Sequence, residues 1–420
     1  MRLNEVEIRN FRGIENCRLQ FHGKMNLIIG KNGVGKTSIL EAVAVGLGGF
    51  ISGLDGVSTR NFTQDELRSQ YAKAGDGSYN QKFILPIEVN CQAEFNRELY
   101  NWKRVREEFR SSRTTLQPRQ IAKVANVQAG NDSSILPLIS YQSAARTWMQ
   151  KRDSQKKTTG AKSSRTSGYH DCLSTVSSRK QIIAWCEKME RIAWQKGLPV
   201  GEYEGAKAAV SKFMTIMEGR YPCSLYYEKQ SEDILYVKDG AAEAISSLSA
   251  GYQSLIWMVF DIAYRMALLN PELRDHLSET PGIVLIDEPD IHLHPEWQWL
   301  LVGALQEVFP NIQFIIASHS PIILASVKNG KIIDVGDIDN ISYREPAYGL
   351  DVNDTLRQVQ ESAGLPAEVA TLQKQFYEAL DREDMASAKQ IVSEIEALIG
   401  NRPIAVEART TFELEAALED

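Results

Sequence analysis

The stretch KMNLIIGKNGVGKTSIL, residues 24–40, decides the fold of this chain. An apolar run at 27–29 is long enough for a buried strand, and Ile39, Leu40 and Val43 follow the glycines at helical spacing. The G-x-x-x-x-G-K-T spacing between them is that of a phosphate-binding loop that joins a strand to a helix. A glycine-rich helix entry is the plainer interpretation, but the strand before it and the helix after it favour the phosphate-binding loop.

Each residue type in this loop has a chemical reason. Glycines lack a Cβ, so the backbone can curl and point successive N–H groups inward, where the helix N-terminus adds partial positive charge. Lys36 carries a charge to the β- and γ-phosphates, and Thr37 offers a hydroxyl to Mg²⁺. ATP and Mg²⁺ are therefore the expected cofactors. The expected nucleotide-binding residues of the loop are Gly30, Asn32, Gly33, Gly35, Lys36, Thr37 and Ser38.

The composition bounds the class of protein. With 420 residues, 43% hydrophobic and 24% charged, the chain has room for two or three structural units of ordinary globular character. The net charge of −7 means that any nucleic-acid role must rest on a local patch. Five scattered cysteines without a C-x-x-C pair argue against a zinc site and for a reducing compartment. Without a membrane-length apolar run or a signal peptide, a cytoplasmic protein with no membrane partner is expected.

The C-terminal half predicts an α/β fold. Near-continuous apolar runs at 282–286 and 312–316 are typical of strands buried in a parallel sheet, and a helix from Pro295 to Val308 is expected between them. The expected divisions are an N-terminal lobe at 1–149, a basic loop plus helical insertion at 150–218, a C-terminal lobe at 219–345 and an acidic helical tail at 346–420.

Two expectations concern where helices end. The helix that follows Thr37 is expected to stop near the glycines at 46–49. In the tail, residues 352–400 are expected to form a hairpin of two helices, broken near the acidic run at 381–384.

Carboxylates follow the apolar run at 282–286. Asp287, at the C-terminal end of a buried strand, is expected to hold Mg²⁺ opposite the phosphate loop, and Glu288 is expected to orient or deprotonate the attacking water. His319, at the end of the next strand, can reach the γ-phosphate and sense its presence. The plainer interpretations are an acidic strand-to-loop turn and a hydrogen-bonded turn histidine.

The segment Leu248-Ser-Ala-Gly251 precedes a helix expected from Tyr252 to Leu269. The hydroxyl of Ser249 and the N–H of Gly251 would form an anion site at the helix N-terminus. Taken alone, this pattern favours an ordinary serine cap followed by glycine, and the anion site gains support only from the order of the other three motifs.

The order of these four motifs resembles the ABC-type ATPase heads of the SMC/RecF-like group. The resemblance implies a P-loop NTPase head in two lobes, and two heads that sandwich two ATP molecules as a homodimer or higher oligomer. Ser249 and Gly251 would then act in trans on the partner's nucleotide. Gln142 resembles the glutamine that contacts Mg²⁺ in such heads, with a polar loop residue as the alternative. The loop 290–295 would meet the partner; a rival interpretation makes Asp290, His292 and His294 metal ligands.

Further motifs narrow the resemblance to the PtuA-like ATPases of Septu and retron anti-phage systems. They are 136–148, 168–173, Trp185 and 348–354. In that family the ATPase works beside an HNH nuclease and, in retrons, beside a reverse transcriptase and its DNA product. Gln142 and Ser143 depart from the expected Tyr-Gly-like pair. The tail is too short for a Toprim nuclease, so no nuclease activity is expected in this chain.

The leading hypothesis is therefore a nucleotide-switched defence ATPase that dimerises and controls a separate effector nuclease. The basic stretch Lys151–Arg165 would contact nucleic acid or the partner, or it is simply a solvated loop. The first alternative is a stand-alone RecF/SMC-like DNA-metabolism ATPase that binds duplex DNA. The second is a scaffold that binds ATP without turnover.

Overall fold

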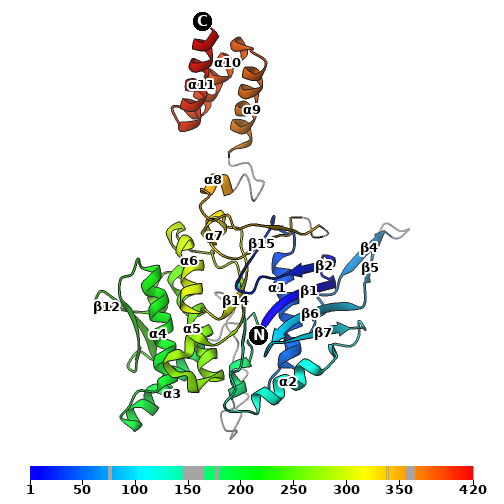
Figure 1. Ribbon diagram of the computed structural model, residues 1–420, viewed down its shortest axis with the longest axis vertical. Helices are drawn as coiled ribbons and strands as arrows, with labels where there is room; N and C mark the ends of the chain where they lie inside the picture. The colour runs from blue at the N-terminus through cyan, green and yellow to red at the C-terminus, as the bar shows by residue number, and fades with distance from the viewer. Residues whose placement is uncertain are drawn as a thin grey trace. The chain divides into compact units, whose positions relative to one another are not determined.

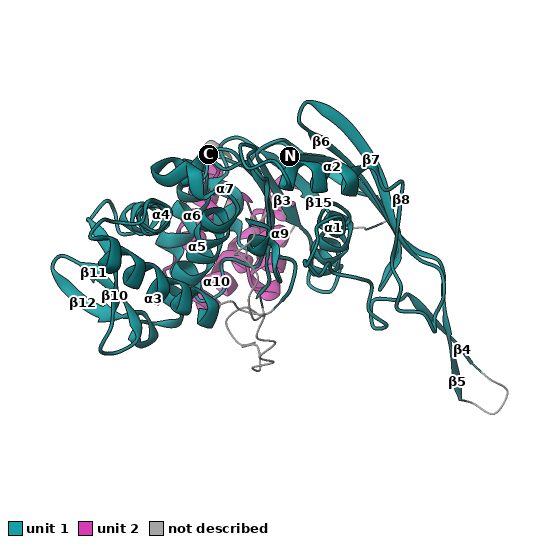
Figure 2. Ribbon diagram, turned by 90° about the horizontal axis from the view of Figure 1, so that it is seen from below, with its two compact units in different colours: residues 1–349 teal, residues 350–420 magenta. Residues whose placement is uncertain are grey.

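A computed structural model describes residues 1–73, 78–144, 165–175, 179–336, 338, 340–355 and 365–419. The chain divides into two compact units, unit 1 at Met1–Gly349 and unit 2 at Leu350–Asp420 (Figure 2). The two motif-bearing lobes and the two helices between them, α3 (Arg179–Lys196) and α4 (Gly201–Met217), all lie within unit 1.

A six-stranded sheet forms the centre of unit 1. Its order is β16 (Ser342–Arg344), β15 (Lys331–Asp334), β3 (Met25–Ile29), β14 (Ile312–Ala317), β13 (Gly282–Asp287) and β9 (Leu138–Gln142), all parallel except the edge strand β16. Every residue of β3, β14, β13 and β9 is buried, which explains their continuous apolar sequences. In register, Ile28 lies opposite Ala317, and Ala317 lies opposite Asp287, so these three strands end in one row.

Helix α1 (Lys36–Ile51) lies on one face of this sheet and contacts a second sheet on its other side (Figure 1). The prediction that glycines stop this helix near residues 46–49 is wrong, because the glycines instead allow close packing. A Cβ on Gly46 would lie 2.5 Å from Cys91 Sγ, and one on Gly49 would lie 2.5 Å from Trp102 Nε1.

The second sheet is antiparallel, with the order β2 (Ile14–Gln20), β1 (Arg2–Phe11), β6 (Ile87–Phe95), β7 (Glu98–Arg106) and β8 (Thr115–Gln117). Helix α2 (Gln120–Ala129) contacts α1 and β7. A hairpin of β4 (Ser69–Lys73) and β5 (Tyr79–Phe83) projects outward from the body of unit 1 (Figure 2).

A layer of helices covers the opposite face of the six-stranded sheet from α1 (Figures 1 and 2). It contains α4 (Gly201–Met217), α5 (Ala250–Leu269), α6 (Pro295–Val308), α7 (Pro321–Ser326) and the 3₁₀ segments η2 (Arg165–Tyr169) and η4 (Pro271–Glu279), with α3 (Arg179–Lys196) packed on α5. Beside them lies a small sheet of β10 (Cys223–Glu228), β11 (Asp233–Lys238) and β12 (Ala241–Ala244), followed by η3 (Ile245–Ser247). The predicted strands at 282–286 and 312–316 and the predicted helix at 295–308 are confirmed.

The described residues of unit 2 contain the short α8 (Val352–Asp354) and then three longer helices, α9 (Ala367–Asp381), α10 (Met385–Ile399) and α11 (Pro403–Glu419). The predicted two-helix tail therefore missed α11. The three helices share their own core, which includes Phe376, Ala388, Ile395 and Ala405. In neither unit do the described residues include a helix with the length and apolar character that a bilayer crossing requires.

Candidate functional site

The phosphate loop curls tightly between β3 and α1. Gly33 and Gly35 take positive φ angles of 84° and 106°, which residues with a Cβ rarely adopt. The ammonium of Lys36 folds back and donates to the carbonyls of Gly30 at 2.8 Å and Lys31 at 3.2 Å. Burial lowers the pKa of Lys36, and the carboxylates of Glu288 and Asp287 act in the opposite direction.

The carboxylate of Asp287 lies against the start of α1. The hydroxyl of Thr37 donates to its two oxygens at 3.0 and 3.2 Å, although the two residues are 250 positions apart. Asp287 is buried, while Thr37 is exposed. A hydroxyl and a carboxylate are oxygen ligands of the kind that Mg²⁺ prefers, so this pair fits that ion.

His319 lies between the phosphate loop and Glu288. Its Nδ1 is 3.3 Å from Lys36 Nζ, and its Nε2 is 3.7 Å from Glu288 Oε1. Burial, and then the nearby charge of Lys36, lowers the pKa of His319. The neutral imidazole can therefore accept a hydrogen bond from the lysine. Glu288 has a φ of 44°, an uncommon angle for a residue with a side chain, and such strain is frequent at functional sites.

The remaining loop residues lie around this centre. Asn32 is exposed beside Gly33, and Ser38 is half-buried in the first turn of α1. Five sequence-predicted residues thus come together in one place: Lys36, Thr37, Asp287, Glu288 and His319.

Ser249 and Gly251 lie elsewhere. Among the described residues no hydrogen bond joins either of them to the phosphate loop. Ser249 is exposed at the N-terminus of α5 and makes no side-chain cap. Gly251 is buried, and a Cβ there would lie 2.6 Å from the carbonyl oxygen of His292. The start of α5 therefore packs directly under the loop that follows Glu288.

The loop 290–295 is held by its own hydrogen bonds. Asp290 accepts from the hydroxyl of Ser318 at 2.8 Å, and His294 caps α6 by accepting from the N–H of Glu296. His292 is exposed. Within the part of the chain that the structure describes, no group of three histidine, cysteine or carboxylate side chains is arranged to hold a metal ion. The rival metal interpretation of this loop gains no support.

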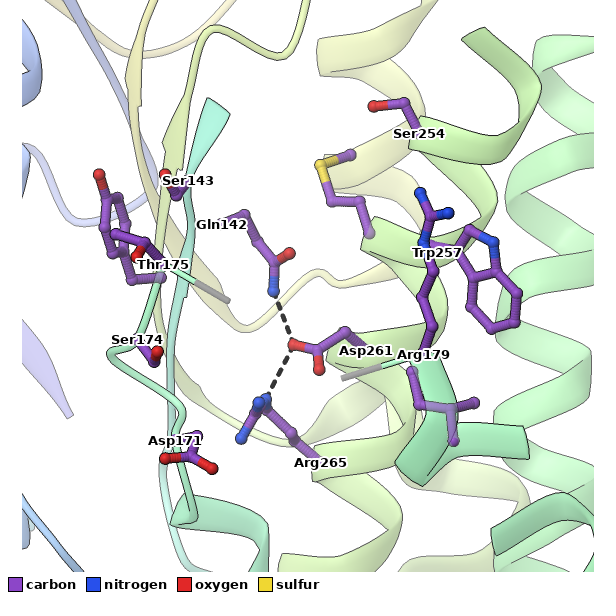
Figure 3. A pocket seen from close by; sticks show the side chains of 13 residues that line it. Gln142, Ser143, Asp171, Ser174, Thr175, Arg179, Ser254, Trp257, Asp261 and Arg265 are labelled. Carbon is purple, nitrogen blue, oxygen red and sulfur yellow. Dashed lines mark hydrogen bonds and ion pairs between the residues drawn. The ribbon is translucent and has the colours of Figure 1, made fainter. Parts of the chain in front are cut away.

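Gln142, the expected Mg²⁺ ligand, points in another direction. Its amide donates to Asp261 of α5 at 2.7 Å and to Ser140 at 2.9 Å. Figure 3 shows Gln142 and Arg265 both directed at Asp261, on the wall of a small pocket between β9 and α5. The structure does not bring Gln142 together with Thr37 and Asp287.

Sequence reasoning missed the buried pair Asp261–Arg265. The two residues are one helical turn apart, and Arg265 Nε lies 2.8 Å from Asp261 Oδ2. Arg265 also donates to the carbonyls of Gly168 and His170. An acid and a base four residues apart inside the otherwise apolar stretch 250–269 was the available signal.

The basic stretch Lys151–Arg165 lies outside the described residues except for Arg165. The guanidinium of Arg165 donates to backbone carbonyls of Asn131 at 3.1 Å, Asp132 at 3.0 Å and Leu269 at 2.8 Å. This arginine therefore ties η2 to α5 and to the chain before β9.

Comparisons with known proteins agree with this geometry. A family described as "AAA domain" matches residues 5–200, and one described as "AAA domain, putative AbiEii toxin, Type IV TA system" matches residues 227–325. The chain is 25% identical to a retron Vc95 probable ATPase of Vibrio cholerae serotype O1 biovar El Tor, over 93% of this chain and 86% of the relative. It is 24% identical to a Septu protein PtuA of Bacillus thuringiensis, over 80% and 76%.

Among solved structures, an SMC head bound to the C-terminal winged-helix domain of ScpA is similar to this chain; the match covers 82% of this chain and 98% of the SMC chain. The TM-score is 0.51 and the sequence identity is 16%, so this similarity shows the fold alone. The chain is thus an ATPase whose fold is the P-loop fold of an SMC head. Within that class it is similar to the retron and Septu PtuA ATPases, so the predicted resemblance is confirmed.

Proposed function

We propose that this chain is the nucleotide-switched ATPase of an anti-phage defence complex of the Septu/retron type. Two or more copies assemble around ATP, and that assembly controls a separate effector, an HNH-type nuclease. In a retron setting a reverse transcriptase and its DNA product join the complex. The similarity to retron and Septu ATPases along most of the chain supports this assignment.

The observation that carries the ATPase mechanism is the cluster of Lys36, Thr37, Asp287, Glu288 and His319 at the row where β3, β14 and β13 end. Lys36 exchanges the carbonyls of Gly30 and Lys31 for phosphate oxygens when ATP binds. The backbone N–H groups of the loop, from Gly30 through Ser38, surround the phosphates.

Thr37 and Asp287 would hold Mg²⁺, which neutralises charge that develops on the phosphates. Glu288 orients the attacking water and accepts its proton, since its carboxylate stands at the rim of the site, one residue beyond Asp287. His319, kept neutral by burial and by Lys36, reports whether a γ-phosphate is present.

The proposed assembly rests on Ser249 and Gly251, which lie away from the cluster around Lys36. Ser249 is exposed and its hydroxyl is not used to cap α5, so it is available to a phosphate carried by a second chain. The loop 290–295 packs on Gly251 and would report contact with that second chain to Glu288. On this proposal hydrolysis requires an assembled pair of heads.

The test is Glu288→Gln, with ATP hydrolysis measured by phosphate release and assembly measured by light scattering with and without ATP. This variant should lose ATP hydrolysis by at least about a hundredfold, because the general base is gone while nucleotide binding remains. It should accumulate as an ATP-dependent dimer or higher oligomer. Adding Ser249→Arg to the same chain should abolish the ATP-dependent assembly and leave nucleotide binding unchanged.

Lys36→Ala provides the control for the primary site, and Lys31→Ala is its matched variant, an exposed lysine in the same loop. Lys36→Ala should lose nucleotide binding in fluorescence titration, whereas Lys31→Ala should keep it. Retained binding in Lys36→Ala would overturn the site, and an ATP-bound Glu288→Gln that stays monomeric would overturn the assembly. Co-purification of a nuclease with the wild-type chain tests the effector.

A further inference from the structure

Unit 1 has a large hollow whose lining residues lie outside the cluster of Lys36, Thr37, Asp287, Glu288 and His319. Its volume is about 880 Å³, and it lies between the segment 58–64, the chain that follows β7 and residues 171–175. Arg60, Arg106 and Arg110 line it, against one carboxylate in the lining, Asp171. Arg60 is paired with the carboxylate of Glu66 at 2.7 Å, so the excess positive charge of the hollow comes from Arg106 and Arg110, in a protein whose net charge is −7.

Two arginines at this hollow are almost buried: Arg106, which lines it, and Arg104, which donates hydrogen bonds to the lining residues Thr59, Arg60 and Asn61. Among the described residues neither forms an ion pair, so their charges are not neutralised by a carboxylate. Burial lowers the pKa of Arg104 to about 10, which still leaves it charged at neutral pH. Their hydrogen-bond acceptors are oxygens of Thr59, Arg60, Asn61, Phe62, Glu108 and Phe109.

Such charges are costly to bury without a counter-charge. An anion held in the hollow would lower this cost, so the site favours a ligand that carries phosphate groups. Arg110 is exposed at the rim and extends the positive surface outward.

The β4–β5 hairpin continues this surface. Its register pairs Tyr71 with Gln81 and Lys73 with Tyr79, so these four side chains share one face. Tyr71 is 64% exposed and Tyr79 is 66% exposed. The two strands contain two lysines and no carboxylate.

The hollow and the hairpin face join through two aromatic rings in contact. Phe83, on the same hairpin face as Tyr79, lies 4.5 Å from Phe109, centroid to centroid, with 30° between the ring planes. Phe109 itself lines the hollow. One continuous surface thus runs from the arginines to the two exposed tyrosines.

We propose that this surface binds single-stranded nucleic acid. Phosphates lie over Arg106 and Arg110, and unstacked bases stack on Tyr71 and Tyr79, which is the combination that non-sequence-specific single-strand binders use. A duplex hides the faces of its bases and cannot use the tyrosines in this way. The surface is separate from the ATP cluster, so the proposal stands independently of the assembly proposed above.

The test is fluorescence anisotropy of the full chain with a labelled single-stranded DNA of mixed sequence, with the same RNA sequence and with the matching duplex. The double variant Tyr71→Ala/Tyr79→Ala should bind either single strand at least about tenfold more weakly, since stacking on an aromatic side chain contributes that much per base. Arg110→Gln should reduce the slope of log affinity against log salt by about 0.7. A preference between DNA and RNA identifies the strand and supports the proposal in either direction.

The matched control is Tyr226→Ala, an equally exposed tyrosine on a strand of another sheet. It should bind like wild type, and all variants should retain wild-type ATP hydrolysis, which shows that they fold. Three results would overturn the proposal: no binding by wild type at low salt, equal affinity in the double-tyrosine variant, or duplex affinity that matches single-strand affinity in every variant.

Discussion

His319 is the residue that connects the two halves of the ATP cluster. It lies 3.3 Å from Lys36 on one side and 3.7 Å from Glu288 on the other, and it is about one third exposed. Desolvation and the lysine charge lower its pKa, while Glu288 pulls the pKa back upward. Protonation would place two positive charges side by side.

We therefore expect a pH dependence of stability with a definite sign. Because the pKa of His319 is lower in the folded chain than its ordinary value of about 6.5, the unfolded chain binds more protons in the window just below that value. The free energy of unfolding should fall as the pH drops through this window. Urea midpoints measured between about pH 7.5 and 5.5 should fall more for wild type than for His319→Gln. Parallel pH profiles for the two proteins would contradict the proposed pKa shift.

The buried pair Asp261–Arg265 predicts a large effect on stability. Asp261→Ala would leave Arg265 buried without its carboxylate, which costs about 3–5 kcal/mol in comparable pairs. It would also remove the acceptor that now holds the amide of Gln142. Chemical denaturation should register the loss as a lower midpoint. As a control, Arg18→Ala removes one partner of an exposed pair and should leave the midpoint unchanged.

At the scale of elements, the N-terminus of α5 and the loop after Glu288 form one packed junction. Gly251→Ala would put a methyl group 2.6 Å from the carbonyl oxygen of His292, and backbone cannot yield as a flexible side chain does. We expect a lower melting temperature and impaired ATP hydrolysis, because Glu288 lies directly before this loop.

Gly303 provides the matched glycine. It lies inside α6, and a Cβ there would meet nothing within 4 Å. Gly303→Ala should therefore stabilise the chain by about 0.5–1 kcal/mol through helix propensity. If calorimetry shows the same change for both glycine variants, the junction at Gly251 is not as tight as described.

The elements also show what sequence could predict. The strands β13 and β14 were predictable because short, continuous apolar runs are typical of strands buried on both faces of a sheet. Helix α6 was predictable because Pro295 marks its start. Helix α1 was predicted too short, because glycines in a sequence usually indicate the end of a helix. Only the structure shows that Gly46 and Gly49 pack against Cys91 and Trp102. The same limit applies to Gln142, whose partner Asp261 lies 119 residues away.

On the scale of the whole molecule, the two units have separate cores. Unit 2 packs Phe376, Ala388 and Ile395 among its own helices, so it has a hydrophobic core of its own. A chain that ends at Gly349 should keep the ATP cluster intact. Scanning calorimetry should show that the truncated chain has lost one transition, while its ATP affinity stays at the full-length value. A fall in ATP affinity would mean that unit 2 supports the site.

The order of strands in the central sheet has a consequence for how the protein is made. The phosphate loop follows β3, near the start of the chain, whereas β14, which neighbours β3 in the sheet, and β13, which lies beyond β14, begin only at Ile312 and Gly282. A ribosome therefore releases the loop long before Asp287, Glu288 and His319 exist. A product that terminates early carries Lys36 and Thr37 but none of these partners. On the mechanism proposed above, translation must pass His319 before a chain can hydrolyse ATP, so we expect chains that end earlier to be inactive.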